Sequence, residues 1–156
     1  MTTQPPTKTA SLHGDPIDFS ALTEISIIAH LAENAFARVL PKGLTTAQFG
    51  VLNHLLRKGQ PETIGDIAAA MQVSQPTMSS TVRKLENQGF VNLIATDADR
   101  RVRRVAVTEA GQIVRDKSIE KIAVIRHSML AEISDTDWAL ILPTLSRIRS
   151  ALDQAR

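Results

Sequence analysis

The stretch from Ser74 to Phe90, SQPTMSSTVRKLENQGF, constrains the fold more than any other part of this chain. Ser74 suits a helix N-cap, because its hydroxyl accepts a free first-turn amide, and Pro76 falls where a missing N–H costs little. Apolar residues recur at i, i+4 and i+7 and predict one buried stripe, made of Met78, Val82 and Leu85. Gly89 suits the left-handed position that ends many helices. The stretch therefore predicts a helix with a narrow apolar face.

The rest of this helix surface is rich in hydrogen-bonding side chains. Most are short and uncharged and two cations follow them: Gln75, Thr77, Ser79, Ser80, Arg83 and Lys84. Side chains of this kind read base edges in the DNA major groove. An ordinary amphipathic surface helix has the same pattern, so the neighbouring segments must decide between the two interpretations.

Two further helices are expected before this stretch. Thr45 and Gln48 fit a capping box for a helix from Thr46 to about Lys58, which Gly59 and Pro61 close. Its expected inner face consists of Phe49, Leu52, Leu55 and Leu56. A short helix from about Ile64 to Met71 follows, with Ile67, Ala68 and Met71 apolar. Two short helices joined by a turn of about three residues predict a helix-turn-helix.

A β-hairpin is expected directly after Gly89. The segments Phe90–Ala95 and Val102–Val107 are rich in β-branched residues, and a polar turn with two aspartates separates them. Four arginines lie at the turn and just after it: Arg100, Arg101, Arg103 and Arg104. Charge runs are commonly solvated faces, but beside a helix-turn-helix this run predicts a basic wing that contacts DNA.

Long helices are expected at both ends of the chain. One begins at Ile17 and stops before Pro41, and another follows the cap at Thr108 and runs to about Ser134. The last helix starts at Ser134 and has a 3-4-3-4 apolar spacing, the rhythm of a coiled-coil seam, with an internal Pro143 expected to kink it. This stripe could pack against the chain's own helices, but we favour packing between two chains. The residues expected at that interface are Leu22, Ile25, Trp138, Ile141, Leu145, Ile148 and Leu152.

Composition excludes several classes of function. The 156 residues suit one globular domain with a real core, and a net charge of +2 says little about partners. The chain has no cysteine, so disulfides, thiolate metal sites and thiol-based sensing are excluded. Its histidines do not cluster at a metal-ligand spacing, and neither a cofactor nor a metal is expected.

Composition predicts the state of the N-terminal segment, and hydropathy predicts the location of the protein. Residues 1–16 contain Pro, Gly, Thr and Ser and are expected to form a disordered tail. No stretch approaches the roughly 18 apolar residues that span a bilayer, and the N-terminus lacks the apolar core of a signal peptide. We therefore expect a cytoplasmic protein without a membrane partner.

Together these residues resemble the multiple-antibiotic-resistance-regulator (MarR) family of winged-helix transcription factors. The resemblance covers roughly Ile17 to Leu152 and is strongest in three motifs: IGDIAAAM from Ile64, TMSSTVRKLENQGFV from Thr77, and DADRRVRRVAVTEAG from Asp97. The last is similar to the family's acidic-then-arginine wing that runs into Leu-Thr-x-x-Gly, with Val107 in place of the leucine. Gln72 stands where family members usually have glycine, which puts the geometry of that turn in doubt.

The resemblance implies a mainly α fold with a small β-hairpin wing. Residues 45–108 would form the winged helix-turn-helix, and residues 17–44 and 109–156 would form a helical dimerisation region. The implied protein is a homodimer that binds a pseudo-palindromic operator in double-stranded DNA, usually to repress transcription.

The resemblance also implies roles for individual residues. The residues that would face base edges or nearby phosphates are Gln75, Thr77, Ser79, Ser80 and Arg83. Ser74, at the cap, belongs to the same DNA-binding set, and Lys84 and Arg103 would contact phosphates. Arg101 would enter the minor groove, where a narrow A·T-rich groove attracts a guanidinium, and Asp99 would hold it in place. The sequence leaves open whether Arg100 exchanges roles with Arg101.

Many members of this family bind a small lipophilic molecule or aromatic acid that loosens the operator complex. The candidate lining here is the inner side of the first two helices: His30, Phe36, Asn53 and His54. Histidines on helices are more often surface or core residues than ligand contacts. The low aromatic content, with no tyrosine, argues against a strongly aromatic pocket.

Three other functions fit this sequence less well. An enzyme is not expected, because the chain has no nucleophile elbow, no phosphate-binding glycine-rich loop and no paired carboxylates at a catalytic spacing. RNA binding lacks stacking aromatic residues on a sheet. A winged helix used only for protein contacts, without an operator, is the main alternative, and the wing arginines and the donor-rich helix argue against it.

Overall fold

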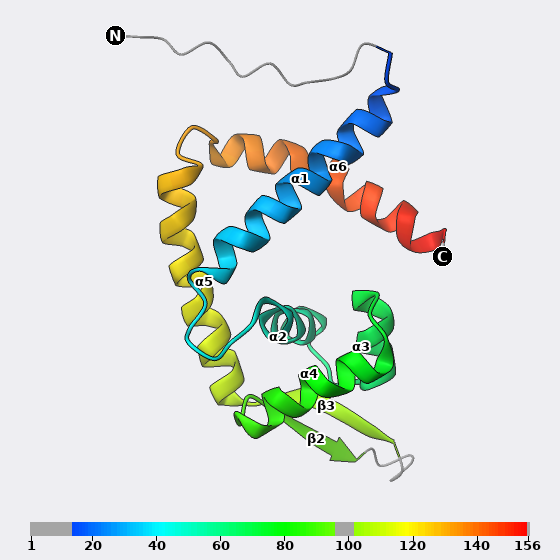
Figure 1. Cartoon of the computed structure of the whole chain (residues 1–156), viewed down its shortest axis with the longest axis vertical. Helices are drawn as coiled ribbons and strands as arrows, with labels where there is room; N and C mark the ends of the chain where they lie inside the picture. Colours follow the sequence, from blue (N-terminus) through cyan, green and yellow to red (C-terminus); the bar gives the residue numbers. More distant parts are fainter. Residues whose placement is uncertain (1–13, 96–101, 156) are drawn as a thin grey trace. The chain divides into compact units, whose positions relative to one another are not determined.

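The computed structural model describes residues 14–95 and 102–155, with only the backbone of Arg126 (Figure 1). Along the chain the elements are α1 (Ile17–Ala37), α2 (Thr46–Lys58), β1 (Glu62–Thr63), α3 (Ile64–Met71), α4 (Gln75–Asn87), β2 (Val91–Ala95), β3 (Arg103–Val107), α5 (Glu109–Met129) and α6 (Asp135–Gln154). They form two units, one up to Arg38 and one from Val39 onward. The mainly α fold with a small antiparallel sheet is the predicted winged helix.

The first unit consists of α1 and the residues before it. The predicted helix is confirmed and ends at Ala37. None of its side chains is buried, and its large apolar residues are mostly exposed: Ile17, Phe19, Leu22, Ile27, Ile28 and Leu31. Thr23 donates a hydrogen bond from its hydroxyl to the Phe19 carbonyl one turn earlier. A helix with this much apolar surface needs something further to cover it.

The second unit is built around a small closed core. Its buried apolar residues come from α2, α3, α4 and the sheet, together with Leu44: Val51, Leu52, Leu55, Ile67, Ala68, Met78, Val82, Leu85, Val91 and Val105. The predicted inner face of α2 is confirmed at Leu52 and Leu55, which are buried, and at Phe49, which packs against the core. It was wrong in leaving out Gln48 and Val51, which are buried. The buried face of α2 is therefore centred between Gln48, Val51, Leu52 and Leu55, and Leu56 lies at its margin.

The sheet has three antiparallel strands in the order β1-β3-β2. The predicted hairpin is confirmed as β2 and β3, with Leu93 opposite Val105. The strand β1 was not predicted, since two residues are too few to show an alternating pattern. Glu62 in β1 lies opposite Val105 in β3, so the short strand closes the second edge of the hairpin.

Caps fix the ends of the helices. The predicted capping box at Thr45 and Gln48 is confirmed, and Gly59 ends α2 in the left-handed conformation. The predicted cap of α6 is also confirmed, where Ser134 and Asp137 exchange hydrogen bonds. Helix α5 ends at Met129, five residues before the predicted end, because Leu130–Ile133 form a turn that leads into this cap.

Helix α5 extends away from the sheet, and α6 follows at its far end (Figure 1). Pro143 lies within α6 as predicted, and the axis of α6 bends along its length (Figure 1). None of the α6 side chains is buried. Among the helices in the described ranges, none combines enough length with enough apolar character to cross a bilayer.

Candidate nucleic-acid interface

The interface begins with α3, which a capping box starts. The Thr63 hydroxyl accepts a hydrogen bond from the Asp66 amide over 3.1 Å, and the Asp66 carboxylate accepts one from the Thr63 hydroxyl over 2.7 Å. The bond from the Thr63 hydroxyl is the main cause that holds the pKa of Asp66 below its ordinary value. Burial acts against it, while a hydrogen bond from the Thr63 amide and the charge of Arg104 also lower the pKa. The start of α3 is therefore fixed by an ionised carboxylate.

The turn between α3 and α4 depends on Gln72. This residue ends α3 with φ 53° and ψ 42°, and it has the single positive φ among the non-glycine residues that the structure describes. Behind it the Val73 amide donates to the Ala68 carbonyl over 3.1 Å. The turn has the left-handed conformation that suits glycine, so the doubt raised by the sequence is resolved: Gln72 adopts the conformation at a cost in strain.

Ser74 begins α4 as the sequence predicted. Its hydroxyl accepts a hydrogen bond from the Thr77 amide over 3.3 Å and shares a second bond with the Thr77 hydroxyl over 2.7 Å. Pro76 lies in the first turn, where no amide is needed. At the other end Gly89 has φ 74°, and the Phe90 amide donates to the Leu85 carbonyl over 2.9 Å. Both ends of α4 are thus fixed by local hydrogen bonds.

The two faces of α4 differ as predicted. Met78, Val82 and Leu85 are buried in the core. The exposed residues are Ser74 at the cap and Gln75, Thr77, Ser80, Arg83 and Lys84 along the helix, while Ser79 is half-buried. Donors and cations therefore gather on the surface that faces away from the core.

Two glutamine side chains link the start of α2 to the end of α4, and neither was predicted from the sequence. The buried Gln48 donates to the Gln88 side-chain oxygen over 3.0 Å, and Gln88 donates to the Gly43 carbonyl over 2.7 Å. This chain joins the start of α2 to the end of α4. No sequence signal identifies it, because the two glutamines lie 40 residues apart.

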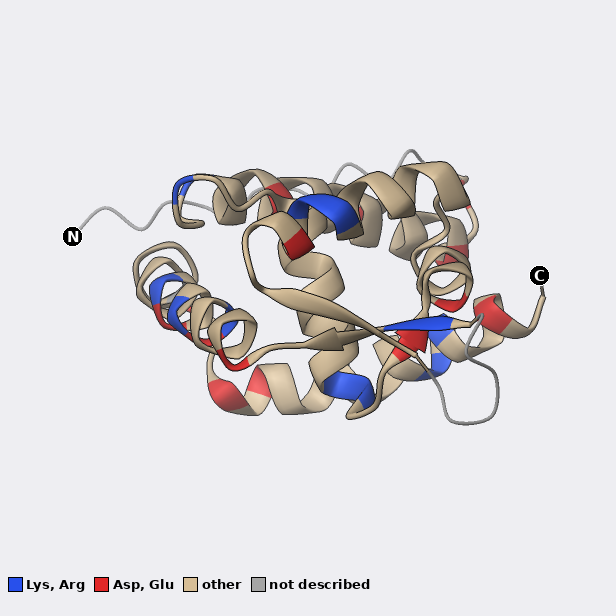
Figure 2. Ribbon diagram, turned by 90° about the horizontal axis from the view of Figure 1, so that it is seen from below, with Lys and Arg blue, Asp and Glu red and all other residues tan. Residues whose placement is uncertain are grey.

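The arginines of β3 have two different roles. Arg103 is exposed, whereas Arg104 is half-buried and donates to the Pro61 carbonyl over 3.2 Å. Arg104 therefore stabilises the sheet against the segment before β1. Figure 2 shows basic segments on both α4 and β3 in the view that looks onto the sheet. The wing-tip residues of the prediction, Asp99, Arg100 and Arg101, lie outside the described residues.

The residues predicted to contact an effector are divided between the units. On α1, His30 shares a hydrogen bond with Asn34 over 3.1 Å, and Phe36 is half-buried. On α2, Asn53 and His54 line a cavity of about 680 Å³ together with residues of α3 and α6. His54 and Glu62 are 2.5 Å apart, and Asn53 accepts two hydrogen bonds from Arg115 of α5.

The residues predicted at a dimer interface are all at least partly accessible. Leu22, Ile141, Leu145 and Leu152 are exposed, and Ile25, Trp138 and Ile148 are half-buried. Exposed apolar residues continue along α5 at Ile113, Val124 and Met129. Within the ranges that the structure covers, no three His, Asp or Glu side chains gather as metal ligands would.

The chain is similar in sequence to known transcriptional regulators. Residues 42–102 match the family model described as "MarR family". The chain is 30% identical over 110 residues to the transcriptional activatory protein BadR of Rhodopseudomonas palustris, an alignment that covers 69% of this chain and 63% of BadR. The chain thus spans slightly less than two thirds of the length of that relative.

Solved structures share the fold. The transcriptional regulator BldR from Sulfolobus solfataricus superposes with a TM-score of 0.73 at 24% identity, over 86% of this chain and 95% of BldR. CouR from Rhodococcus jostii RHA1, solved bound to p-coumaroyl-CoA, gives a TM-score of 0.69 at 23% identity, over 86% of this chain and 94% of CouR. At these identities the likeness establishes the fold.

Proposed function

The chain belongs to the MarR family of winged-helix transcription factors, and we propose that it binds a pseudo-palindromic DNA operator as a homodimer. Its family consists of transcriptional regulators rather than enzymes. The observation that carries the proposal is the division of α4 into a buried apolar stripe and an exposed face of donors and cations. A helix of this kind fits the major groove, where such side chains distinguish base pairs.

Within α4 the roles divide by side-chain chemistry. The exposed amide and hydroxyl groups of Gln75, Thr77 and Ser80 suit base edges, and Arg83 suits a guanine or a phosphate. Lys84 and Arg103 suit phosphates, because attraction between charges carries no sequence information. Ser74 is already bonded to Thr77, so its contribution is to fix the first turn that approaches the DNA.

The wing adds a minor-groove contact to this account. We assign that contact to Arg101, positioned by Asp99, with Arg100 as the residue that could exchange roles with it. Arg104 is assigned to the protein, since its guanidinium already donates to the Pro61 carbonyl. The exposed Arg103 in β3 would follow the backbone beside the groove.

Dimerisation is supported by the apolar surface of the terminal helices. Exposed leucine, isoleucine and valine side chains recur on α1, on α5 and on α6, and exposed apolar surface marks interaction sites. Residues 17–44 and 109–156 are therefore proposed as the dimerisation region. A two-fold axis would place two copies of α4 about one helical turn apart, which explains why the operator should be an inverted repeat.

Three properties follow from this proposal. A regulator of chromosomal DNA would work in the cytoplasm. Repression stays our prediction, although BadR is by name an activatory protein, because the direction of regulation depends on where the operator lies relative to the promoter. A small-molecule effector is proposed because CouR, with the same fold, was solved bound to p-coumaroyl-CoA.

Selection from random duplexes tests the proposal. The purified protein is mixed with a library of random duplexes at about 150 mM salt, where non-specific attraction is reduced, and the retained DNA is sequenced. The proposal predicts an enriched inverted repeat with half-sites about one helical turn apart. A folded dimer that enriches no sequence would contradict it and would favour the winged helix as a protein-contact module.

A further inference from the structure

Helix α5 is attached to the winged helix at its first turn. The amide and the hydroxyl of Thr108 donate to the carbonyls of Phe90 and Gly89 over 3.1 and 2.7 Å, just after the end of α4. Gly111 lies against the same segment, since a Cβ on it would be 2.1 Å from the Phe90 carbonyl oxygen. This attachment fixes where α5 begins, but a helix held only at its end can still tilt.

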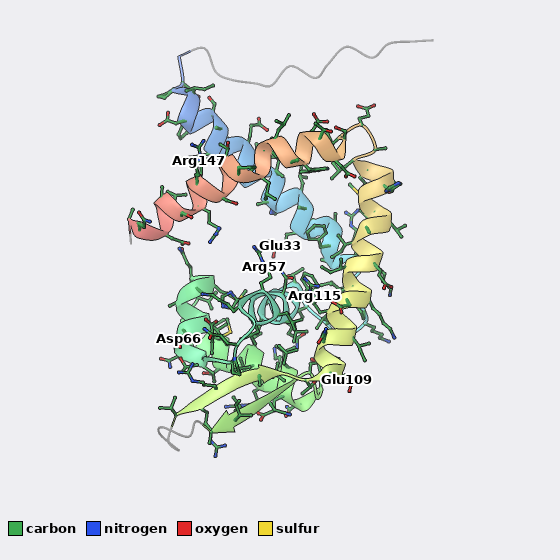
Figure 3. All side chains as sticks on the ribbon, turned by 180° about the vertical axis from the view of Figure 1, so that it is seen from behind. Glu33, Arg57, Asp66, Glu109, Arg115 and Arg147 are labelled. Carbon is green, nitrogen blue, oxygen red and sulfur yellow. The ribbon has the colours of Figure 1, made fainter. Side chains whose placement is uncertain are left out.

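A second attachment lies one turn further along α5, at Arg115. Its Nε and Nη2 both donate to Oδ1 of Asn53 in α2, over 3.2 and 2.8 Å. Figure 3 shows Arg115 on the part of α5 that runs beside α2. Nη1 donates to the neighbouring Asp116 over 2.9 Å, which orients the guanidinium. The Arg115 side chain is only 24% exposed, and hydrogen bonds from a cation are stronger where water is partly excluded.

The attached side of α5 is one continuous helix face. Gly111, Val114, Arg115 and Ser118 follow each other at the spacing i, i+3, i+4 and i+7. Val114 packs against the winged-helix core, and Ser118 is fully buried, with its hydroxyl bonded to the Val114 carbonyl of its own helix. Apolar and small residues allow sliding, whereas the paired hydrogen bonds of Arg115 favour one orientation. Arg115 therefore defines the angle between α5 and the winged helix.

The length of α5 makes this angle important for a dimer. The segment from Arg115 to Met129 is about 21 Å long at 1.5 Å per residue, and a tilt of about 10° displaces its far end by about 3–4 Å. One base pair of B-DNA moves a half-site by about 3.4 Å and turns it by about 35°. In a dimer paired through the terminal helices, a small tilt at the Asn53 contact thus corresponds to about one base pair of half-site spacing.

We infer that Asn53 and Arg115 are positioning residues that restrict the protein to one half-site spacing. The inference rests on the proposed function, since it concerns how the homodimer presents its two copies of α4 to an inverted repeat. With the hydrogen bonds intact, the two copies are held at one separation, and another spacer binds only if the DNA deforms. Without them α5 tilts more freely, and more spacers are accepted.

Duplexes with altered spacers test this role. Fluorescence anisotropy compares the selected inverted repeat with duplexes whose spacer is one base pair shorter or longer, and with a single half-site. The natural chain should bind the altered spacers about tenfold more weakly than the selected one. In Arg115→Gln this ratio should fall below about threefold, because the angle of α5 is no longer fixed. Affinity for the single half-site should stay within about twofold, since the contacts of α4 are unchanged.

Matched variants separate the contact from the charge. Lys117→Gln removes an exposed cation two residues away, off the attached face, and should keep the full spacer preference. Asn53→Asp retains an oxygen acceptor for Arg115 and should also keep it. Asn53→Leu removes the acceptor and should behave as Arg115→Gln. Retention in Asn53→Asp together with loss in Asn53→Leu would assign the effect to the hydrogen bonds.

A distance measurement tests the same role without DNA. The chain has no cysteine, so Asn87→Cys at the exposed end of α4 creates a single site for a spin label. Pulsed electron paramagnetic resonance of the labelled homodimer gives the distribution of separations between the two copies of α4. The added Arg115→Gln substitution should broaden this distribution, and the added Lys117→Gln substitution should leave it unchanged.

The outcomes separate this inference from the proposed function. Equal spacer ratios in Arg115→Gln and Lys117→Gln would overturn the inference and leave the DNA-binding proposal intact. An equal loss of affinity in Arg115→Gln for every duplex, the single half-site included, would also overturn it, because the contact would then only support folding. A natural chain that binds no duplex would overturn the proposed function, while the label separations would still decide whether Asn53 and Arg115 hold α4 in position.

Discussion

The winged helix buries its apolar side chains, whereas the helices that follow it leave many of theirs exposed. Between Leu44 and Val107, apolar residues from α2, α3, α4 and the sheet close a core in which Leu52, Ile67 and Leu85 are fully buried. In α6 none of the side chains is buried, and Leu140 and Leu142 are 70% and 63% exposed. The first region covers its apolar surface within one chain, and the second leaves its apolar surface exposed to solvent.

This difference shows which part of the protein closes its hydrophobic core within one chain. Burial of apolar surface contributes about 25 cal/mol per Å², so a helix that leaves its leucines exposed forgoes that stabilisation. The two regions meet at a tight junction, where Thr108 donates from its hydroxyl to the Gly89 carbonyl over 2.7 Å. A Cβ on Gly111 would lie 2.1 Å from the Phe90 carbonyl oxygen, so α5 can start against α4 only with glycine there. Helix α5, part of the proposed dimerisation region, is thus fixed directly to the end of α4.

The largest effect is expected from a cavity in the winged-helix core. Leu52→Ala removes a fully buried side chain, and truncations of this kind cost about 2–5 kcal/mol. Urea unfolding should show that loss at every protein concentration, because the Leu52 side chain packs within one chain. A loss below about 1 kcal/mol would show that the core is looser than its burial indicates.

A charge on the α6 seam should act on dimerisation instead. Leu145→Asp places a carboxylate in the proposed apolar interface and should raise the dimer dissociation constant about a hundredfold, close to 2.7 kcal/mol. Sedimentation equilibrium measures this directly. Thr144→Asp is the matched control, since this exposed neighbour lies off the seam. If both variants dimerise equally, the seam is wrong.

The wing provides the converse test, in which DNA binding changes and the dimer does not. Arg101→Ala should weaken operator binding by about 1–3 kcal/mol, because a minor-groove guanidinium is lost. Fluorescence anisotropy with the selected duplex measures the change, and Lys121→Ala on α5 serves as the control. Unchanged affinity in a folded Arg101→Ala dimer would remove the wing from the mechanism.

A smaller, stabilising effect is expected at the turn of the helix-turn-helix. Gln72 has φ 53°, a conformation that costs a non-glycine residue energy. Gln72→Gly should raise the free energy of unfolding by about 0.5–1 kcal/mol, because relief of strain exceeds the extra entropy of the unfolded chain. Thermal unfolding should show a higher midpoint. A lower midpoint would mean that the Gln72 side chain makes a contribution that outweighs the strain.

The smallest effect concerns the acid dependence of stability. Hydrogen bonds from Thr63 lower the pKa of Asp66 in the folded chain, so the folded state favours the ionised form. Its contribution is complete above the ordinary aspartate pKa and is lost as the pH falls through the lowered value. Asp66→Asn should therefore reduce the loss of stability between about pH 6 and pH 3. Asp137→Asn should do the same at α6, where hydrogen bonds from Ser134 lower the pKa of Asp137. An unchanged acid dependence in both variants would contradict this role.

Much of the fold followed from local sequence signals. The caps at Thr45, Ser74 and Ser134, the stripe of α4 and the hairpin all depend on neighbouring residues, and the structure confirms them. The exact face of α2 was missed because Gln48 enters the core, where Gln88 satisfies its amide. An analysis by periodicity assigns every glutamine to the polar surface, because it contains no information about a distant hydrogen-bond partner.

Contacts between distant segments could not be predicted. Arg104 was one of four similar arginines in the sequence, and only the position of Pro61 shows that it stabilises the protein itself. The links from Asn53 to Arg115 and from His54 to Glu62 join α2 to α5 and β1, and no local pattern marks them. Candidate DNA contacts were easier to propose, because the periodicity itself reveals an exposed, donor-rich helix face.

The central claim is that a self-contained winged helix reads DNA while the exposed helices pair two copies of it. The most direct test is the mass of the complex formed with the selected inverted repeat and with a duplex that contains a single half-site. The account predicts two chains on each inverted repeat and much weaker binding to the single half-site. One chain per duplex, with equal affinity for the half-site, would contradict it.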